Sequence, residues 1–388
     1  MNIHVFGITG TNGKTTVSYI LRNILKTSGK KCDLIGTISH QIGEHEYEAI
    51  NTTPSAKLLE EFFLEMKEAG TQCCVMEVSS HALIQGRIDH ISINYAGFTN
   101  LTQDHLDYHK EMEEYYQAKK KLFIMSKSAN VINIDDFYGK RLYGELMAND
   151  AKALLSYSMK DKKADFYGEI CEKTEQGTLI HFYERGAFSG DLIIKTPGVF
   201  SVYNGLLAAG LARAGGVAFE HIAQGMQEVQ GVPGRFEVFY GKKGETAIVD
   251  FAHTPDALEN LLKEAQNLKK NGRLISVFGC GGNRDRGKRK IMGRVAGSYS
   301  DYVIVTSDNP RQEDPEDIAA EIEEGVYDTG CDYHVVIDRY QAIKRAVSIC
   351  RKGDIIVIAG KGHEAYQIIG NQKKPFDDRQ IVREELEK

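Results

Sequence analysis

The sequence has no tryptophan, only seven prolines and no surplus of positive charge, since its formal net charge is −6 at pH 7. The lack of tryptophan by itself excludes no class of function. The negative net charge argues against broad nucleic-acid binding, because phosphates attract basic surfaces. No apolar run is long enough to span a membrane and no signal peptide is recognisable, so we expect no membrane association.

The cysteines give no sign of a disulfide framework or a metal site. The seven cysteines show neither disulfide nor zinc spacing, which is typical of a reducing compartment and predicts a cytoplasmic protein. What the chain does have is an ordinary enzyme composition, with 42% hydrophobic and 26% charged residues over 388 positions. This length and composition predict a globular enzyme of two domains.

Strand-like and helix-like segments alternate along the chain, which predicts an α/β fold with a largely parallel sheet. We expect a P-loop-type central domain over residues 1–232 and a Rossmann-like domain over residues 233–388, divided at a Gly-Val-Pro-Gly turn. Short β-rich segments between residues 153 and 195 predict a small antiparallel sheet attached to the main sheet. The predicted strands are 3–6, 32–35, 72–77, 91–98 and 129–133, then 246–251, 274–278, 302–306, 334–337 and 355–358.

Residues 7–16 read Gly-Ile-Thr-Gly-Thr-Asn-Gly-Lys-Thr-Thr and follow the first apolar segment. Glycines at a strand end let backbone N–H groups turn toward phosphate oxygens. Lys14 would then contact the β- and γ-phosphates, and the Thr15 hydroxyl would face Mg²⁺. Ile8 stands where a strict Walker A motif has its first glycine, yet the Gly-Lys-Thr-Thr ending predicts a phosphate-binding loop followed by a helix over 15–26.

Two further segments after predicted strands carry candidate groups. Glu77 ends an apolar strand, where a carboxylate is costly unless paired or metal-bound, so we predict that it joins Thr15 at Mg²⁺; a water-facing side chain is the alternative. His105 lies in a loop rich in polar groups and is predicted at the metal or nucleotide site. Zinc is not favoured, because no cysteine or third histidine accompanies His105 and His109. The three lysines at 119–121 predict, from composition, a solvated helix face.

Three loops of the second domain carry groups suited to a zwitterionic ligand. Residues 279–290 join a glycine turn to a basic cluster, but Arg284 stands where a dinucleotide fingerprint needs its third glycine. Residues 307–311 and 360–364 also follow predicted strands. Arginines suit carboxylates and Glu364 can accept from an ammonium, so these loops predict an amino-acid pocket, ordinary connecting loops being the alternative.

Taken together, these motifs resemble the Mur ligase family, and within it the ligases that add the third amino acid of the peptidoglycan stem peptide. The resemblance extends over essentially the whole chain as the family's central and C-terminal domains. It rests on the motifs at residues 10–16, 52–54, 77–81, 99–109, 115–119, 233–237, 250–256, 279–289, 308–311 and 360–364. The Asp-Asn-Pro-Arg version of the 308–311 loop is associated with meso-diaminopimelate rather than lysine.

The resemblance implies an ATP-dependent amide ligase that works through an acyl phosphate, with ATP and Mg²⁺ as cofactors. It places ATP on Gly10, Thr11, Asn12, Gly13, Lys14, Thr15, Thr16, Asn204, Arg235 and Asp250, and the metal on Thr15, Glu77, His105 and a carbamylated Lys119. It places the muramoyl-peptide acceptor on Thr52, Thr53, Ser79, Arg87 and His253, and the amino acid on Arg284, Asn309, Arg311, Gly360 and Glu364. Lys14, Lys119, His105 and Arg235 would be catalytic. For Lys119, the carbamate replaces the solvated interpretation, because a neutral amine can add CO₂.

Three departures from the family pattern bear on the substrates. The family's N-terminal domain, which holds the uridine nucleotide, is expected to be missing, while Ser201 and Phe251 replace a common Asn and Tyr. The substrates would be small molecules, and a partner chain would be one way to hold the acceptor. Open alternatives are a paralogue acting on a UDP-free acceptor in a specialised pathway, a folylpolyglutamate-type ligase, a non-catalytic nucleotide-binding partner of a larger synthetase, and a nicotinamide dehydrogenase.

Overall fold

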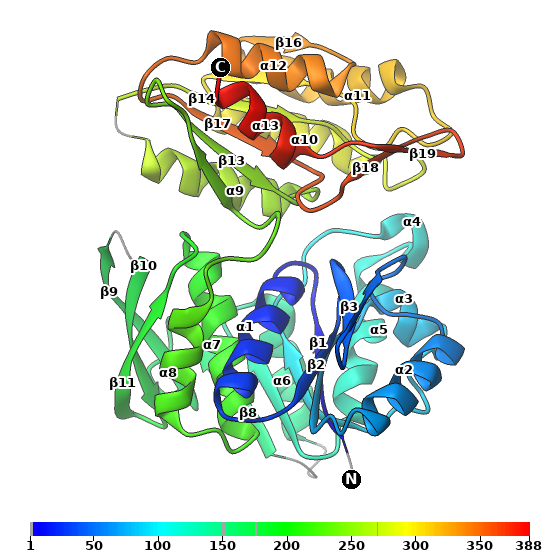
Figure 1. The fold of residues 1–388 in the computed structure, drawn as a ribbon, viewed down its shortest axis with the longest axis vertical. Helices are drawn as coiled ribbons and strands as arrows, with labels where there is room; N and C mark the ends of the chain where they lie inside the picture. Colours follow the sequence, from blue (N-terminus) through cyan, green and yellow to red (C-terminus); the bar gives the residue numbers. More distant parts are fainter. Residues whose placement is uncertain (1–2, 149–152, 175–176, 270) are drawn as a thin grey trace. The chain divides into compact units, whose positions relative to one another are not determined.

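The computed structural model describes residues 3–148, 153–174, 177–269 and 271–388. The chain divides into two compact units (Figure 1). The first comprises Met1–Thr102 and Glu111–Gln230, and the second comprises Gln103–Lys110 and Gly231–Lys388. Within the described ranges, no helix is both long and apolar enough to cross a bilayer.

The first unit is built on one eleven-stranded sheet with the order β11-β10-β9-β8-β7-β6-β1-β5-β2-β3-β4. Pairing is parallel from β9 through to β2, and antiparallel strands extend both edges. The predicted antiparallel segment is therefore an edge of the main sheet, made of β9 to β11. The strands are β1 (His4–Thr9), β2 (Cys32–Ile35), β3 (Ser39–Ile42), β4 (His45–Glu48), β5 (Cys73–Glu77), β6 (Ile93–Phe98), β7 (Ala129–Asn133), β8 (Ala153–Ser158), β9 (Phe166–Thr174), β10 (Gly177–Glu184) and β11 (Ala187–Ile194).

Helices cover both faces of this sheet and enclose two apolar clusters. One cluster holds α1 (Lys14–Thr27), α7 (Val199–Ala214) and α8 (Phe219–Glu228) against the strands. The other holds α2 (Ala56–Glu68), the short α3 (Ser80–Ile84), α5 (Met112–Met125) and α6 (Phe137–Met147). The α7 helix is buried along most of its length, as expected for a helix that is apolar on nearly every side.

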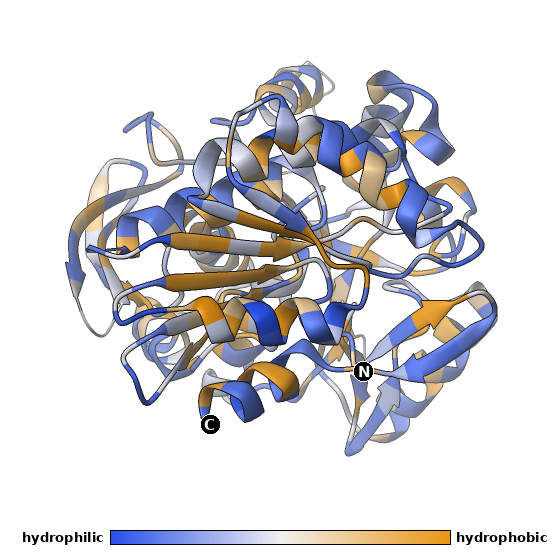
Figure 2. Cartoon of the chain, turned by 90° about the horizontal axis from the view of Figure 1, so that it is seen from above, coloured by the Kyte–Doolittle hydropathy of each residue, from blue (hydrophilic) through white to orange (hydrophobic). Residues whose placement is uncertain are grey.

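The second unit is built on a six-stranded sheet with the order β12-β13-β17-β14-β15-β16, in which only the β12–β13 pair is antiparallel. Every residue of β14 and β17 is buried, which explains why their sequences are apolar apart from Ser276. In Figure 2 the hydrophobic colour follows such strands, whereas helices carry hydrophilic stretches. The strands are β12 (Glu237–Tyr240), β13 (Thr246–Asp250), β14 (Leu274–Phe278), β15 (Tyr302–Val305), β16 (Tyr333–Val335) and β17 (Ile355–Ala359), with a separate hairpin of β18 (Tyr366–Ile369) and β19 (Gln372–Pro375).

The helices of the second unit include a pair that packs on the sheet as one apolar cluster, α12 (Arg339–Ile349) and α13 (Asp378–Leu386). The others are α4 (Leu106–His109), α9 (Pro255–Leu268), α10 (Gly287–Tyr299) and α11 (Pro315–Tyr327). The α9 and α11 helices each begin with a proline after a capping Thr254 or Asp314 side chain. Proline suits this first position because its missing N–H has no partner in the helix anyway.

Both sheets place several loops at one edge. In the first unit the neighbouring strands β6, β1, β5 and β2 end at residues 98, 9, 77 and 35, so the loops that follow them are neighbours too. In the second unit β17, β14 and β15 are neighbours in the same way. The carboxyl ends of parallel strands are where ligands bind in open α/β sheets. Each unit therefore has its own candidate site.

Candidate nucleotide and amino-acid sites

The glycine loop after β1 turns sharply into α1 and packs tightly. Gly10 and Gly13 have φ values of 146° and 90°, which only glycine adopts easily. A Cβ at Gly13 would overlap the Asn204 side chain of α7, and one at Gly10 would overlap the Thr99 hydroxyl. The loop and Asn204, both predicted to bind ATP, are thus in direct contact.

Two lysines converge on this loop. Lys14 Nζ donates to the carbonyls of Gly10 and Thr11, each at 2.8 Å, and Lys119 Nζ donates to the same Gly10 carbonyl at 2.9 Å. The Lys119 ammonium also lies 4.5 Å from the centroid of the Tyr115 ring. The two amines predicted to be catalytic in this unit therefore meet at one backbone oxygen.

The solvated interpretation of residues 119–121 is wrong for Lys119, whose exposed fraction is 2%. Its position on α5 explains this, because it lies one turn after the buried Tyr115 and shares the sheet-facing side of the helix. Lys121 is exposed, and Lys120 is partly exposed and pairs with Glu145 at 2.7 Å. Composition does not distinguish the three lysines, whereas the period of the helix places Lys119 on the buried side of α5 and Lys121 on the exposed side.

Asn100, in the loop after β6, is hydrogen-bonded to the glycine loop after β1. Its side chain accepts from the Asn12 N–H at 3.0 Å and donates to the Asn12 carbonyl at 3.2 Å. Its own carbonyl accepts from the Thr11 N–H at 2.9 Å. The sequence contained Asn100 within a noted motif, but its role in shaping the loop depends on the pairing of β6 with β1 and was not predicted.

Glu77 is fully buried at the end of β5 and is surrounded by hydroxyl groups. Its Oε2 accepts from the Thr15 hydroxyl at 2.9 Å and from the Thr37 hydroxyl at 2.8 Å. Its Oε1 accepts from the Thr37 N–H at 3.0 Å and from the Ser18 hydroxyl at 3.4 Å. The alternative of a water-facing Glu77 is wrong.

Oxygen donors of this kind suit Mg²⁺, which prefers carboxylate, hydroxyl and phosphate oxygens. The Thr15 hydroxyl and the Glu77 carboxylate, within hydrogen-bonding distance of each other, fit that preference. Among the described residues no three His, Cys, Asp or Glu side chains gather as a metal-binding group. A magnesium ion here would therefore take much of its coordination from phosphates, water or a modified side chain.

The four first-unit residues predicted to bind the acceptor lie beside Glu77. Thr53 donates its hydroxyl to the Glu77 carbonyl at 2.9 Å and accepts from the Ser79 N–H at 3.0 Å. Arg87 donates to the Thr53 carbonyl at 2.8 Å. Thr52 lies 3.1 Å from Thr37, hydroxyl to hydroxyl. Thr37 thus links the Glu77 carboxylate to the predicted acceptor residues.

In the second unit, Arg235 and Asp250 lie near each other. Asp250 accepts from the backbone N–H groups of Phe236 and Ala252, each at 2.7 Å. Burial raises the pKa of Asp250, against the opposing effects of Arg235 and these two hydrogen bonds. The Arg235 guanidinium stacks over the Phe251 ring at 4.5 Å. Both groups predicted to contact ATP in this unit are therefore held in defined positions.

His253 and His105 both lie close to Asp104. His253 donates from Nδ1 to the Phe251 carbonyl at 2.7 Å, and its Nε2 lies 3.8 Å from Asp104 Oδ2. His105, with φ at 56°, places Nε2 at 3.3 Å from the same oxygen. The Lys288 ammonium lies 3.6 Å from the other Asp104 oxygen. His105 is thus part of a polar cluster of the second unit.

The charges in this cluster shift two pKa values. Burial by itself would raise the pKa of Asp104, but the nearby His105, Lys288 and His253 outweigh it and hold that pKa well below its usual range. Burial lowers the pKa of His253, and the Lys288 charge adds to this effect. The Asp104 carboxylate therefore favours its charged form, and the His253 imidazole favours its neutral form.

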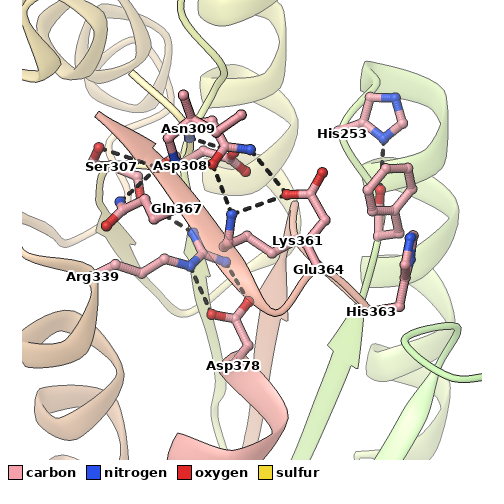
Figure 3. A network of polar contacts seen from close by, with 12 residues as sticks. His253, Ser307, Asp308, Asn309, Arg339, Lys361, His363, Glu364, Gln367 and Asp378 are labelled. Atoms are coloured by element: carbon pink, nitrogen blue, oxygen red, sulfur yellow. Dashed lines mark hydrogen bonds and ion pairs between the residues drawn. The ribbon is translucent and has the colours of Figure 1, made fainter. Parts of the chain in front are cut away.

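The loops after β15 and β17 are joined by a polar network (Figure 3). Lys361 Nζ donates to Asn309 Oδ1 and to Glu364 Oε2, each at 3.0 Å. Asn309 Nδ2 donates to Glu364 Oε2 at 3.0 Å, and the Ile368 N–H donates to Asn309 Oδ1 at 2.9 Å. Gly360, at the start of the second loop, has φ at 118°, and a Cβ there would lie 2.6 Å from the Asp308 carboxylate.

The basic cluster after β14 divides into paired and unpaired members. Arg286, Arg289 and Lys290 form ion pairs with acidic residues on or just before α11, including Glu313, Glu321 and Glu324. Arg284 donates to the Asn283 carbonyl at 3.0 Å. Arg311, with φ at 53°, donates to the Gly282 carbonyl at 2.9 Å.

Within the described part of the chain, neither Arg284 nor Arg311 has a carboxylate at ion-pairing distance. They are close enough that a Cβ at Gly281 would lie 2.9 Å from Arg311 Nη1 and 3.7 Å from Arg284 Cγ. Burial lowers the pKa of the Arg311 guanidinium, and the charge of Arg284 adds to this. An anionic ligand group would relieve that repulsion.

Sequence reasoning missed three residues that organise these sites: Thr37, Asn100 and Lys361. Each follows a strand that was predicted, so proximity to a strand end was the available signal. Thr37 lies after Gly36, at which a Cβ would be 2.6 Å from Glu77 Oε1, and Lys361 stands between two glycines. Their contacts come from neighbouring strands, which a linear pattern does not identify.

Comparison with known proteins gives a consistent family. The model described as "Mur ligase middle domain" matches residues 8–212, and the one described as "Mur ligase, glutamate ligase domain" matches residues 234–362. The chain is 44% identical over 382 residues to a UDP-N-acetylmuramoyl-L-alanyl-D-glutamate--2,6-diaminopimelate ligase of Alkaliphilus oremlandii, covering 98% of this chain and 78% of that protein. It is also 44% identical to the protein of the same name from Clostridioides difficile, covering 79% of it.

Solved structures agree. One solved structure is of a UDP-N-acetylmuramoyl-L-alanyl-D-glutamate--2,6-diaminopimelate ligase, with a TM-score of 0.69 and 35% identity to this chain. The match covers 100% of this chain and 78% of that chain. A Mycobacterium tuberculosis folylpolyglutamate synthase complexed with ADP has a TM-score of 0.74 but only 18% identity, with 93% of this chain and 88% of that chain covered. The second likeness shows a shared fold alone.

Proposed function

Since this chain belongs to the Mur ligase family, we propose that it joins meso-diaminopimelate, or a similar diamino acid, to the carboxylate of a muramoyl-dipeptide-like acceptor at the expense of ATP. One observation carries the choice of amino acid. Arg284 and Arg311 lie together without a carboxylate partner among the described residues, and Glu364 lies in the adjoining network. Two guanidinium groups beside a carboxylate suit a ligand end that bears both a carboxylate and an ammonium.

In the proposed reaction, an acceptor carboxylate oxygen attacks the γ-phosphorus of ATP. The bond from that phosphorus to the β–γ bridging oxygen breaks, which releases ADP and leaves an acyl phosphate. The amine of the diamino acid then attacks the acyl carbon, and the tetrahedral intermediate expels phosphate as the amide forms and the amine loses a proton. Activation converts an oxide into a good leaving group, so positioning and charge neutralisation supply most of the catalysis.

The first unit would bind the phosphates and orient the acceptor. Lys14, the glycine loop and the N-terminus of α1 supply the positive charge and the N–H donors. Mg²⁺, when bound, would neutralise phosphate charge, and Thr15 and Glu77 are the oxygen ligands that fit it. We propose Lys119, as a carbamate, for a further ligand, since its amine is buried at Gly10 beside the loop.

The second unit would bind the amine substrate and contribute to the nucleotide site. Arg235 and Asp250 are proposed to contact the γ-phosphate and the ribose, and His105 remains a predicted metal residue. His253 is proposed for the acceptor side, where burial favours its uncharged form by lowering its pKa. These assignments rest on the motifs and on the defined positions of the side chains.

The substrates are tested by an ADP-release screen. Diaminopimelate, lysine and glutamate are crossed with UDP-linked muramoyl dipeptide, its UDP-free analogue and a folate. We expect ADP release that needs both diaminopimelate and a muramoyl dipeptide, and the two acceptors show whether UDP is required. Glutamate-dependent turnover with the folate alone would overturn the proposal in favour of a folylpolyglutamate-type ligase.

Catalysis itself is tested with a matched pair of lysine variants on α5. Lys119→Ala removes the buried amine at the nucleotide loop, whereas Lys121→Ala removes an exposed one. We expect Lys119→Ala to lose ligation and Lys121→Ala to keep it. Added short-chain carboxylic acids that restore part of the Lys119→Ala activity would support the carbamate. Full activity of Lys119→Ala would overturn the assignment.

A further inference from the structure

The ammonium of Lys361 is buried among polar groups that face the amino-acid site. We infer that Lys361 is a positioning residue: it fixes the amide orientation of Asn309 and opposes protonation of Glu364, so that these two side chains present a donor and an acceptor to the incoming amino acid. The inference deepens the proposed function and, for its effect on substrate, rests on it. Nothing in the sequence motifs distinguished this lysine from its flanking glycines.

Lys361 has the burial and contacts of a fixed cross-link. Its side chain is fully buried, and Nζ lies 3.0 Å from both Asn309 Oδ1 and Glu364 Oε2 (Figure 3). The Tyr366 ring, at the start of β18, has its centroid 5.7 Å from the same nitrogen. A buried ammonium is costly unless it is paired and hydrogen-bonded, and these contacts meet that need.

The orientation of the Asn309 amide follows from its neighbours. Lys361 Nζ and the Ile368 N–H are donors without acceptor capacity, and both contact the same Asn309 atom. That atom must be the carbonyl oxygen, because a flipped amide would place its NH₂ against two donors. Nδ2 then donates one N–H to Glu364 at 3.0 Å, and its second N–H is the donor that the amide can offer a ligand.

The charge state of Glu364 depends on the same lysine. Burial raises the pKa of Glu364 and the negative charge of Asp308 raises it further, while Lys361 opposes both. The charged groups that face this region are Lys361 from the same loop, Asp308 and Arg311 from the loop after β15, and Arg339 from α12, which is paired with Asp378 of α13. Without Lys361, two buried carboxylates would compete for the remaining positive charge, and protonation of Glu364 would relieve the repulsion.

The first test replaces Lys361 with methionine, which keeps an unbranched side chain and removes the charge. We expect the KM for diaminopimelate to rise at least about tenfold, the factor for one pKa unit, while the KM for ATP stays unchanged. Raising the pH from 7 to 9 should reduce the difference from wild type as Glu364 ionises. Equal losses for both substrates, or a loss independent of pH, would overturn the inference.

A matched control separates positioning from general stability. Arg273→Met removes a cation that pairs with the buried Asp354 at 2.7 Å. Asp354 directly precedes β17, whereas Lys361 follows it, so this pair lies at the opposite end of the strand. Arg273→Met should lower thermal stability without changing the KM for diaminopimelate. In the double variant Lys361→Met/Glu364→Gln, the loss of diaminopimelate affinity should be smaller than the product of the two single losses, because part of the effect of Lys361 acts through Glu364. Additive losses would contradict this.

A readout that needs no substrate keeps the inference separable from the proposed function. The titration of the Glu364 carboxyl is followed by ¹³C NMR, with Glu364→Gln used for assignment. We expect its midpoint to rise by at least about one pH unit in Lys361→Met, or in Lys361→Gln if the first variant does not fold. An unchanged midpoint overturns the inference. A raised midpoint in a protein whose wild type ligates no diaminopimelate would refute the proposed function and leave the action of Lys361 on Glu364 established.

Discussion

The ion pair between Arg339 and Asp378 gives a sharp test of how the second unit is held together. Both side chains are fully buried, and Arg339 donates from Nε and Nη2 to the two Asp378 oxygens at 2.9 and 2.7 Å (Figure 3). Arg339 Nη2 also donates to the Ala359 carbonyl at 3.0 Å. The pair thus connects α12, α13 and the end of β17.

Breaking this pair on one side leaves a buried guanidinium without its counter-charge. Asp378→Asn keeps the shape of the side chain, so we expect it to cost about 3–5 kcal/mol in the free energy of unfolding. The double variant Arg339→Met/Asp378→Leu removes both charges and leaves two backbone carbonyls without this donor, that of Ala359 and the more distant one of Ser307 at 3.5 Å. A buried acceptor that loses its donor costs about 1–3 kcal/mol. The double variant should therefore be more stable than the single one.

Because the chain lacks tryptophan, one introduced tryptophan reports on the second unit without background. Tyr302→Trp places it on β15, against the apolar cluster of α12 and α13. Urea unfolding of all variants is compared in this background. With a slope of about 2 kcal/mol per molar urea, a loss of 4 kcal/mol lowers the midpoint by about 2 M.

Two results would refute the reasoning. One is a loss below about 1 kcal/mol for Asp378→Asn, which would mean that the pair is screened like a surface pair. The other is a double variant less stable than Asp378→Asn, which would mean that the packing of these side chains, not their charge, is decisive. Lys263→Met, which breaks an exposed pair with Glu259 on α9, is the control and should cost less than about 1 kcal/mol.

Three further predictions concern the first unit. Burial lowers the pKa of His40 to about 4, so the unfolded chain binds a proton at this histidine more readily than the folded chain. The free energy of unfolding should therefore fall as the pH drops from about 6.5 toward 4, by about 1–2 kcal/mol at pH 5. In urea titrations, His40→Gln should not show this decrease. Gly36→Ala would place a Cβ 2.6 Å from Glu77 Oε1, so the KM for ATP should rise about tenfold, whereas Gly144→Ala, with open space around it, should leave kinetics unchanged. Thr37→Val removes the hydroxyl contacts to Glu77 and Thr52 and should lower kcat/KM about 10- to 100-fold. Thr37→Ser keeps the hydroxyl and should retain most of the activity. A valine variant as active as the serine variant would contradict this prediction.

The strands were the most predictable part of the fold. The predicted segments 129–133 and 274–278 match β7 and β14 residue for residue, because both strands are fully buried and most of their residues are apolar. The β4 strand and the β19 strand were missed because all their residues are exposed, so no apolar pattern marks them. Edge hairpins of this kind depend on the neighbour that they pair with.

The candidate sites divide in the same way. Gly10, Gly13, Lys14 and Thr15 could be assigned together to a phosphate site because the proposed loop is one contiguous segment. Lys119 was misjudged from composition, since three adjacent lysines differ only in which side of α5 they occupy. Those functional assignments remain proposals, and what the structure adds to them is position.

The sequence by itself determined the α/β alternation, the glycine turn between the first strand and the first helix, and the family, because each of these depends on local order or on motifs that need no knowledge of neighbours. Only the tertiary structure decided that Thr37 shares Glu77 with Thr15, and that Lys361 joins Asn309 to Glu364. Those contacts form between loops that follow adjacent parallel strands but lie far apart along the chain. Their geometry is set by the order of strands in the sheet, which a linear sequence does not display.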